Sequence, residues 1–430
     1  MVKRLTSLFI AICLTGSLLL PVYAEEIEKV GDHEVANENI ATTETATSET
    51  ADYDVQSEEN ENQALAENIA LFQSNQVQPT DDASKMSVRK DRNVLSITDG
   101  NVAVIDENSD LYVWGKTIGE TTPKKVLSDV VSVTLGDCNG AAIDANGTLY
   151  TWGDNRNGQL GNGNTTTTID PQKVMDNVSS VRIGGSGVYS YMAAVTTEGV
   201  LYTWGWGVSG GLGDGRKKNY RNSPYKVMEN VIEVECSKSS NGAVITDTGD
   251  LYMWGQNSNG ELGTGDTTDC YYPTKVMTDV TAVSLGYATT GAIRKGGILY
   301  TWGYNVFGNA GWGTEQNHYT SPELLMTGIR DVKFYAGNGS ALGKDGTLYM
   351  WGRNSDGALG MGKDSYVEGI TRVVGEVKSF GGNSLGENSW ARSFAITKDN
   401  DLLTWGYNKD GGIGNGKTET QRTPIVVLED

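Results

Sequence analysis

The feature that most limits the fold of this chain is a short apolar segment ending in Trp-Gly, which recurs seven times. The residues concerned are Trp114, Trp152, Trp204, Trp254, Trp302, Trp351 and Trp405. Their spacings are 38, 52, 50, 48, 49 and 54 residues. A period near 50 residues with strand-like content is typical of a propeller or another repeat array.

Four short strands are predicted in each unit. In the second unit they cover residues 130–136, 141–144, 148–152 and 172–175, and Ala145-Asn146-Gly147 forms a tight turn between the second and third. The first unit is shortened, because only 9 residues separate Trp114 from Pro123, against 19 or 20 in the other units. Its glycine-rich loop is therefore missing.

The repeats predict an all-β, seven-bladed β-propeller of four-stranded blades over residues 91–430. A single blade leaves two apolar faces exposed, and radial stacking buries both. A buried Trp removes about 150–250 Å² from water, so we assign the seven repeated Trp residues a structural role between blades. We also expect the last strand, Pro424–Leu428, to close the ring by joining the blade built from residues 94–114.

Residues 1–24 read as a signal peptide. Lys3 and Arg4 precede an apolar core, Leu8–Leu20, and Val22-Tyr23-Ala24 is an acceptable cleavage site. An uncleaved anchor is the alternative. The apolar stretch is short for a membrane span, so we expect a secreted or cell-surface protein with no membrane span after cleavage.

Residues 25–90 predict a disordered acidic linker. They hold 16 acidic and 4 basic residues and no Trp, and low hydrophobicity with high net charge disfavours a packed core. We interpret this segment as a solvated spacer, with a specific interaction tail as the alternative.

Composition argues against several classes of function. The net charge of −20 would repel a phosphate backbone, so no nucleic-acid partner is expected. The chain has only two His, His33 and His318, so we predict no metal site, no cofactor, no catalytic residues and no enzyme activity. Gly207–Gly211 fits a Gly-x-Ser-x-Gly pattern, but no His is placed to serve Ser209.

Three cysteines remain after the signal peptide, Cys138, Cys236 and Cys270, so at least one thiol stays unpaired within the chain. A bridge between Cys236 and Cys270 is one option. Two unpaired thiols are the other.

Binding residues are expected on one rim, because the loops after the first and third strands of each unit share one end of the blade. The residue after Trp-Gly differs in every unit: Lys116, Asp154, Trp206, Gln256, Tyr304, Arg353 and Tyr407. Exposed aromatic side chains are typical anchors of binding sites. The candidate partner-binding residues are Tyr189, Tyr191, Trp206, Tyr287, Tyr304, Phe307, Trp312, Trp390 and Tyr407. Packing of the loops against one another is the alternative role.

The repeat resembles that of the regulator of chromosome condensation family. The likeness is carried by residues 345–362 (DGTLYMWGRNSDGALGMG) and 147–163 (GTLYTWGDNRNGQLGNG). The resemblance implies a seven-bladed propeller, in a family that includes nucleotide exchangers for small GTPases, scaffolds and secreted β-lactamase-inhibitory proteins. One departure is the lack of a His shortly before the second strand, where this chain reads GDCNG at 136–140.

These patterns together predict an exported, non-enzymatic module that binds a protein through one loop rim, with inhibition of that partner as one form. A carbohydrate or cell-wall binding module is the alternative, because rim aromatics also suit sugars. Guanine-nucleotide exchange is a further alternative that rests on the family resemblance alone.

Overall fold

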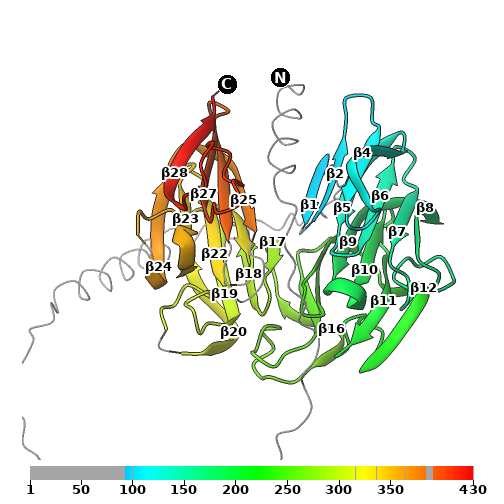
Figure 1. Ribbon diagram of the computed structural model, residues 1–430. Coiled ribbons are helices and arrows are strands. Elements are labelled where there is room, and N and C mark those ends of the chain that lie inside the picture. Colours follow the sequence, from blue (N-terminus) through cyan, green and yellow to red (C-terminus); the bar gives the residue numbers. More distant parts are fainter. Residues whose placement is uncertain are drawn as a thin grey trace, which may run out of the picture. The chain divides into compact units, whose positions relative to one another are not determined.

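Each of the seven repeat units forms its own four-stranded antiparallel sheet, as predicted. The computed structural model describes residues 93–98, 100–314, 316–335, 337–363, 365–383 and 391–429. Figure 1 shows the sheets following one another in chain order, from the cyan first blade to the red last one. The expected signal peptide (1–24) and acidic linker (25–90) lie outside the described residues.

The first four blades contain sixteen strands and one short helix. Blade 1 contains β1 (Leu95–Thr98), β2 (Asn101–Ile105), β3 (Leu111–Gly115) and β4 (Glu120–Leu127). Blade 2 contains β5 (Val130–Leu135), β6 (Asn139–Asp144), β7 (Leu149–Gly153) and β8 (Thr168–Met175). Blade 3 contains β9 (Val178–Gly184), the 3-10 helix η1 (Gly187–Tyr189), β10 (Tyr191–Thr196), β11 (Leu201–Val208) and β12 (Lys218–Met228). Blade 4 contains β13 (Val231–Cys236), β14 (Asn241–Thr246), β15 (Leu251–Gly255) and β16 (Cys270–Met277).

The last three blades follow the same order. Blade 5 contains β17 (Val280–Leu285), β18 (Thr289–Arg294), β19 (Ile298–Tyr304) and β20 (His318–Met326). Blade 6 contains β21 (Ile329–Phe334), β22 (Asn338–Gly343), β23 (Leu348–Asn354), the 3-10 helix η2 (Ser355–Gly357) and β24 (Ser365–Val374). Blade 7 contains β25 (Val377–Asn383), β26 (Arg392–Thr397), β27 (Leu402–Gly406) and β28 (Gln421–Leu428).

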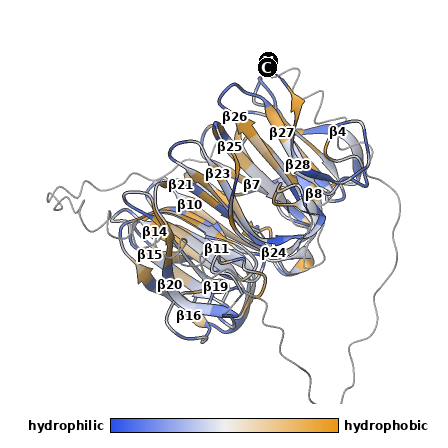
Figure 2. Cartoon of the chain, turned by 90° about the vertical axis from the view of Figure 1, so that its left-hand side faces the viewer, coloured by the Kyte–Doolittle hydropathy of each residue, from blue (hydrophilic) through white to orange (hydrophobic). Residues whose placement is uncertain are grey.

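The repeated Trp residues fill the junctions between consecutive blades. Trp204, for example, packs with Met192 of its own blade against Ala141 and Ile143 of blade 2. Apolar clusters of this kind join each of the six consecutive pairs of blades. Figure 2 shows hydrophobic segments lying along the strands, with hydrophilic residues in many of the connecting loops. The structural role predicted for these Trp residues agrees with this packing.

Trp114 of blade 1 differs from the other six repeated Trp residues. Those six have no exposed side-chain surface, whereas Trp114 is half-buried. Its blade also leaves Leu95 and Ile97 38% and 46% exposed, and Phe394 of blade 7 is 39% exposed. Blades 7 and 1 therefore share no apolar cluster within the described part of the chain.

The predicted ring closure by the last strand is wrong. β28 pairs with β27 of its own blade, with Leu403 opposite Val426, instead of joining residues 94–114. The reason is that blade 1 is already complete, because β4 supplies its fourth strand and pairs with β3, with Tyr112 opposite Lys125. Each blade is thus built from four consecutive strands.

A hydrogen bond from five of the six fully buried indoles joins neighbouring blades. The Nε1 groups of Trp204, Trp254, Trp302, Trp351 and Trp405 donate to a loop carbonyl of the preceding blade at 2.9–3.0 Å. Trp302, for instance, donates to the carbonyl of Glu261 at 3.0 Å. The buried Nε1 of Trp152 finds no acceptor among the described residues. The equivalent loop of blade 1 is the one that the shortened first unit lacks.

The glycine that follows each repeated Trp is required by the backbone. Gly153 has a φ of 107°, and a Cβ there would lie 2.2 Å from the carbonyl oxygen of Cys138. An L-amino-acid side chain is strained at that φ and would clash at that distance. The Trp-Gly pair therefore reflects blade geometry and carries no binding information.

The three described cysteines, Cys138, Cys236 and Cys270, are all unbridged thiols. The structure therefore favours the second of the two options that the sequence left open.

Candidate functional site

The candidate site is the loop rim, defined as the loops that follow the first and the third strand of each blade. Because the four strands of each sheet are consecutive and antiparallel, these two sets of loops emerge at the same end of every blade. The short turns after the second strand lie at the opposite end. This agrees with the expectation from strand order alone.

A repeated hydrogen bond holds the variable residue of the rim loop in place in five blades, 2, 4, 5, 6 and 7. The first side chain of the second strand donates to the carbonyl of the residue after Trp-Gly. Asn338 reaches the carbonyl of Arg353 at 3.0 Å, Thr289 that of Tyr304 at 2.8 Å, and Arg392 that of Tyr407 at 3.0 Å. Asn139 and Asn241 bond the carbonyls of Asp154 and Gln256 in the same way. The backbone of the rim is therefore uniform while its side chains differ.

An aromatic pair on blade 3 joins an exposed ring, Tyr189, to a half-buried one, Trp206. The ring centroids of Tyr189 and Trp206 are 5.1 Å apart at an interplanar angle of 48°. Tyr189 is 56% exposed. Its loop is tied to blade 2, because Gln159 and Asn157 both donate to the carbonyl of Val188, at 2.6 and 2.9 Å. The pair is thus a large apolar surface on a fixed support.

A second aromatic group belongs to blades 5 and 6. Tyr304 and Phe307 meet edge to face with centroids 6.1 Å apart, and the guanidinium of Arg353 lies 5.3 Å from the Phe307 ring. Tyr287, in the neighbouring loop of blade 5, is 50% exposed. The carbonyl of Tyr287 accepts a hydrogen bond from Ser239 of blade 4.

Tyr191 is not a rim residue, in contrast to the prediction. It is fully buried, and its hydroxyl donates to the carbonyl of Asn241 at 2.5 Å. Burial raises the pKa of this phenol well above its usual value. Tyr191 is the first residue of β10, the position that Asn139 occupies in blade 2, so its side chain points into the fold.

The remaining predicted rim residues are less accessible than expected or lie outside the description. Trp312 is half-buried against the core of blades 5 and 6, and its Nε1 donates to Thr301 at 3.0 Å. Tyr407 is half-buried, with the guanidinium of Arg392 5.5 Å from its ring. Trp390 lies outside the described residues.

Two features were missed by the sequence reasoning. Tyr220 on β12 and Tyr272 on β16 are 64% and 65% exposed on outer strands. Charged residues also alternate along the first strands of blades 4 and 6, as in VIEVEC and RDVKF. Alternating charge on a strand could have marked the second feature, because it indicates one polar face.

The described residues offer little catalytic chemistry. They contain no cluster of three potential metal ligands. Burial raises the pKa of the Cys236 thiol to about 12, which keeps it protonated and unreactive at neutral pH. Within the same residues, no helix has the length and apolar character needed to traverse a bilayer. The arrangement is suited to binding through surface side chains.

Comparison with family models identifies the repeats. Residues 146–189, 198–244 and 248–293 match the regulator of chromosome condensation (RCC1) repeat, and residues 130–159 match a second model of the same repeat. Among curated proteins, the ultraviolet-B receptor UVR8 of Arabidopsis thaliana is 28% identical over 63% of this chain and 63% of its own length. The human E3 ubiquitin-protein ligase HERC2 is 30% identical over 39% of this chain but only 4% of its own length. The chain thus spans less than two thirds of these relatives.

Solved structures share the fold at low sequence identity. Prp20p of Saccharomyces cerevisiae, described with its binding to Gsp1p and histones, is 18% identical with a TM-score of 0.59, covering 81% of this chain and 88% of that one. Human WBSCR16 is 19% identical with a TM-score of 0.57, covering 72% and 84%.

Proposed function

We propose that this chain, a seven-bladed propeller whose residues 130–293 contain matches to the regulator of chromosome condensation repeat, is a non-enzymatic binding protein whose loop rim holds a protein partner. The observation that carries the proposal is the exposed Tyr189 packed on the half-buried Trp206, on a fixed support. Aromatic side chains bury much area for little loss of rotamer entropy, so they are frequent anchors of interfaces.

Structures with the same fold support a binding role in general terms. The structure of yeast Prp20p is described with its binding to Gsp1p and histones, and another holds Kap60 bound to the same protein. The partner of this chain is a separate question, because identity to those structures is 18%. We infer a protein partner as a class and derive its chemistry from the rim.

The site of action is proposed to be outside the cytoplasm. The support is the Lys3-Arg4 pair, the apolar core Leu8–Leu20 and the cleavage site ending at Ala24. Fractionation of expressing cells followed by N-terminal sequencing is expected to give a protein in the extracytoplasmic fraction that begins at Glu25. A protein that stays in the cytoplasm with residues 1–24 intact would contradict this part.

The rim is tested by replacing Tyr189, Trp206 and Tyr287 together with Ala. We expect at least a tenfold loss of partner capture from an extracellular fraction, because a buried aromatic anchor contributes about 2 kcal/mol or more. Binding is measured by pull-down and then by titration with the identified partner. The matched control is Tyr272→Ala, since Tyr272 is 65% exposed on an outer strand. Equal capture by both variants and the unaltered protein would exclude the rim.

Carbohydrate binding is the second candidate, and the same Tyr189–Trp206 pair favours it. Apolar faces of sugar rings stack on exposed aromatic rings, as on other apolar surfaces. Retention on cell-wall polysaccharide that is lost in Trp206→Ala would support this candidate. Capture of protein alone would support the first.

A further inference from the structure

The first strands of consecutive blades lie side by side on the inner face of the propeller, called here the channel wall, and this wall carries one strongly charged sector. Two side chains from the first strand of each blade face the channel, on either side of a buried residue such as Val234, Val283 or Val332. In blade 4 these two residues are Glu233 and Glu235, and in blade 6 they are Asp331 and Lys333. The equivalent positions are Ser132 and Thr134 in blade 2 and Ser379 and Gly381 in blade 7. Charge is therefore concentrated on one side.

A cavity of about 590 Å³ opens in this sector. It is lined by β13, β17 and β21, the first strands of blades 4, 5 and 6. Blade 5 places only Ala282 and Ser284 where its neighbours carry long charged side chains, so the wall is hollowed there. Its volume falls within the range of about 300–1,000 Å³ that is typical of small-molecule sites.

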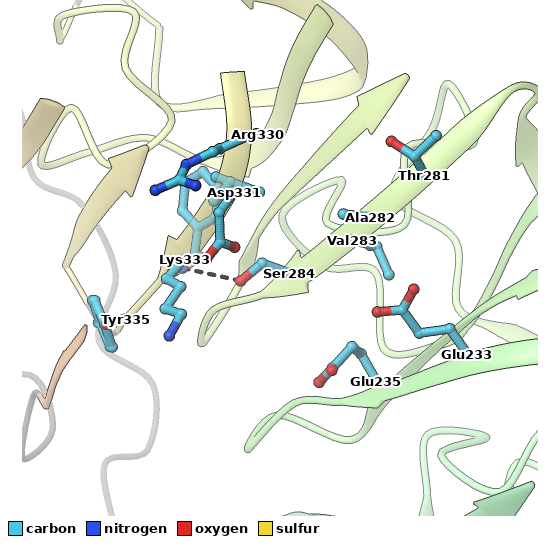
Figure 3. Close-up of a pocket in the computed structure, with 12 residues that line it drawn as sticks. Glu233, Glu235, Thr281, Ala282, Val283, Ser284, Arg330, Asp331, Lys333 and Tyr335 are labelled. Carbon is cyan, nitrogen blue, oxygen red and sulfur yellow. Dashed lines mark hydrogen bonds between the residues drawn. The ribbon is translucent and has the colours of Figure 1, made fainter. Parts of the chain in front are cut away.

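The two sides of the cavity carry different charges. Figure 3 shows the carboxylates of Glu233 and Glu235 on one side and Arg330, Asp331 and Lys333 on the other, with Ser284 between them. The β13 side is purely acidic, whereas the β21 side has two cations and one carboxylate. Such a cavity has separate places for a positive and a negative group.

Interactions with neighbouring blades hold these charges in position. Arg182 of blade 3 forms an ion pair with Glu235 at 3.0 Å. Lys333 donates to the carbonyl of Phe380 at 2.9 Å, and Arg330 to that of Val377 at 3.0 Å. An ammonium has three donors and a guanidinium five, so each cation keeps further donors for a ligand.

Asp331 lies on the same side of the cavity as the two cations. Its pKa is raised because burial disfavours the carboxylate, with Lys333 and Arg330 opposing the shift. A raised pKa makes Asp331 easier to protonate, which lessens its repulsion of a ligand carboxylate held by Arg330 and Lys333. The hydroxyl of Ser284 lies between the two charged sides of the cavity, where its Oγ accepts a hydrogen bond from the amide of Phe334 at 3.1 Å.

We propose that the channel cavity binds a small zwitterion, of amino-acid to tripeptide size, with its ammonium toward Glu233 and Glu235 and its carboxylate toward Arg330 and Lys333. The site contains none of the residues replaced in the rim test, although Tyr335, at the start of the blade 6 rim loop, also lines it; it stands without the rim proposal. It adds a small-molecule site to a protein whose proposed role is to bind a partner.

The test uses triglycine and two capped forms as probes of the full-length protein, by calorimetric titration or ligand-observed NMR. N-acetyl-triglycine lacks the ammonium and triglycine amide lacks the carboxylate. We expect triglycine to bind and each capped form to bind at least tenfold more weakly. Absence of triglycine binding at millimolar concentration, or equal binding of all three peptides, would overturn the proposal.

Two variants test which side of the cavity binds the ammonium of the ligand and which side binds its carboxylate. Glu233→Gln is expected to weaken the binding of triglycine and triglycine amide, which carry the ammonium, and to leave the binding of N-acetyl-triglycine unchanged. Lys333→Gln is expected to weaken the binding of triglycine and N-acetyl-triglycine, which carry the carboxylate, and to leave the binding of triglycine amide unchanged. Ser379→Ala in blade 7 is the matched control and should change none of them. Circular dichroism and the thermal midpoint establish that each variant is folded. Folded Glu233→Gln and Lys333→Gln proteins that bind triglycine like the control would contradict the assignment. The variant with Ala at Tyr189, Trp206 and Tyr287 should still bind triglycine, so failure of the rim proposal and failure of this one can be told apart.

Discussion

Trp302→Ala is expected to destabilise the propeller by about 3–5 kcal/mol, the usual cost of removing a large aromatic side chain from a core. Trp302 is fully buried between blades 4 and 5 and donates to the carbonyl of Glu261 at 3.0 Å. The substitution leaves a cavity at the junction, and the Glu261 carbonyl keeps only its hydrogen bond from the Thr290 hydroxyl at 2.8 Å. Urea unfolding followed by circular dichroism measures the difference in the free energy of unfolding.

Two comparisons make this prediction specific to the junction. Trp114→Ala should cost clearly less than Trp302→Ala, because Trp114 is half-buried. Trp152→Phe should cost less than Trp302→Phe by about 1 kcal/mol, the usual net value of a hydrogen bond, since the Nε1 of Trp152 has no acceptor in the described structure. Equal costs at Trp114 and Trp302 would mean that the junctions do not carry the stability.

The number of blades could be predicted from the sequence, but not the residues at which each blade begins and ends. Repeated Trp-Gly pairs mark one strand in each unit, so the number of blades follows from counting them. Where one blade ends and the next begins depends on which neighbours the outer strand pairs with. The link between β8 and β9 is only a tight turn with Asn177 at a φ of 59°, and no sequence signal separates that turn from one within a blade.

The rim could be located from strand order, while exposure of its side chains could not. Tyr191 lies 13 residues before Trp204, the same separation that places Asn139 before Trp152 and Asn241 before Trp254. Aligning the units on Trp would have shown that Tyr191 starts a buried strand. The channel charges were missed for another reason. Alternation in β13 and β21 shows a polar face, but only the side-by-side packing of blades 4, 5 and 6 shows that this face lines a cavity.

Blades 4 and 2 carry different residues at one buried position of the loop after the third strand. Glu261 is 2% exposed, and its Oε2 accepts from the amide of Asn259 at 2.7 Å, whereas its Oε1 has no hydrogen-bond partner among the described residues. Gln159 occupies the equivalent position in blade 2 and also donates to the carbonyl of Val188 at 2.6 Å. Burial raises the pKa of Glu261 from 4.5 to about 7, so its charge is costly at neutral pH.

Glu261→Gln is therefore expected to stabilise the protein at pH 8 by roughly 2–4 kcal/mol, from about 1.36 kcal/mol per unit of pKa shift. Between pH 4.5 and about 7 the folded protein holds a proton on Glu261 that the unfolded chain has released. The contribution of Glu261 to the free energy of unfolding is therefore greatest below pH 4.5, decreases as the pH rises from 4.5 to about 7, and is constant at higher pH. The advantage of the Gln variant should follow the opposite course and vanish near pH 4.

Urea unfolding of both proteins at pH 4, 5.5 and 8 measures this difference, and taking variant minus unaltered protein cancels the other carboxylates. Gln159→Glu is the matched control, because it places a carboxyl where an amide donates to Val188. It should destabilise the protein at pH 8 more than at pH 4. A Glu261→Gln effect that does not change with pH would show that Glu261 has the same pKa in the folded protein as in the unfolded chain, and would contradict the shift caused by burial.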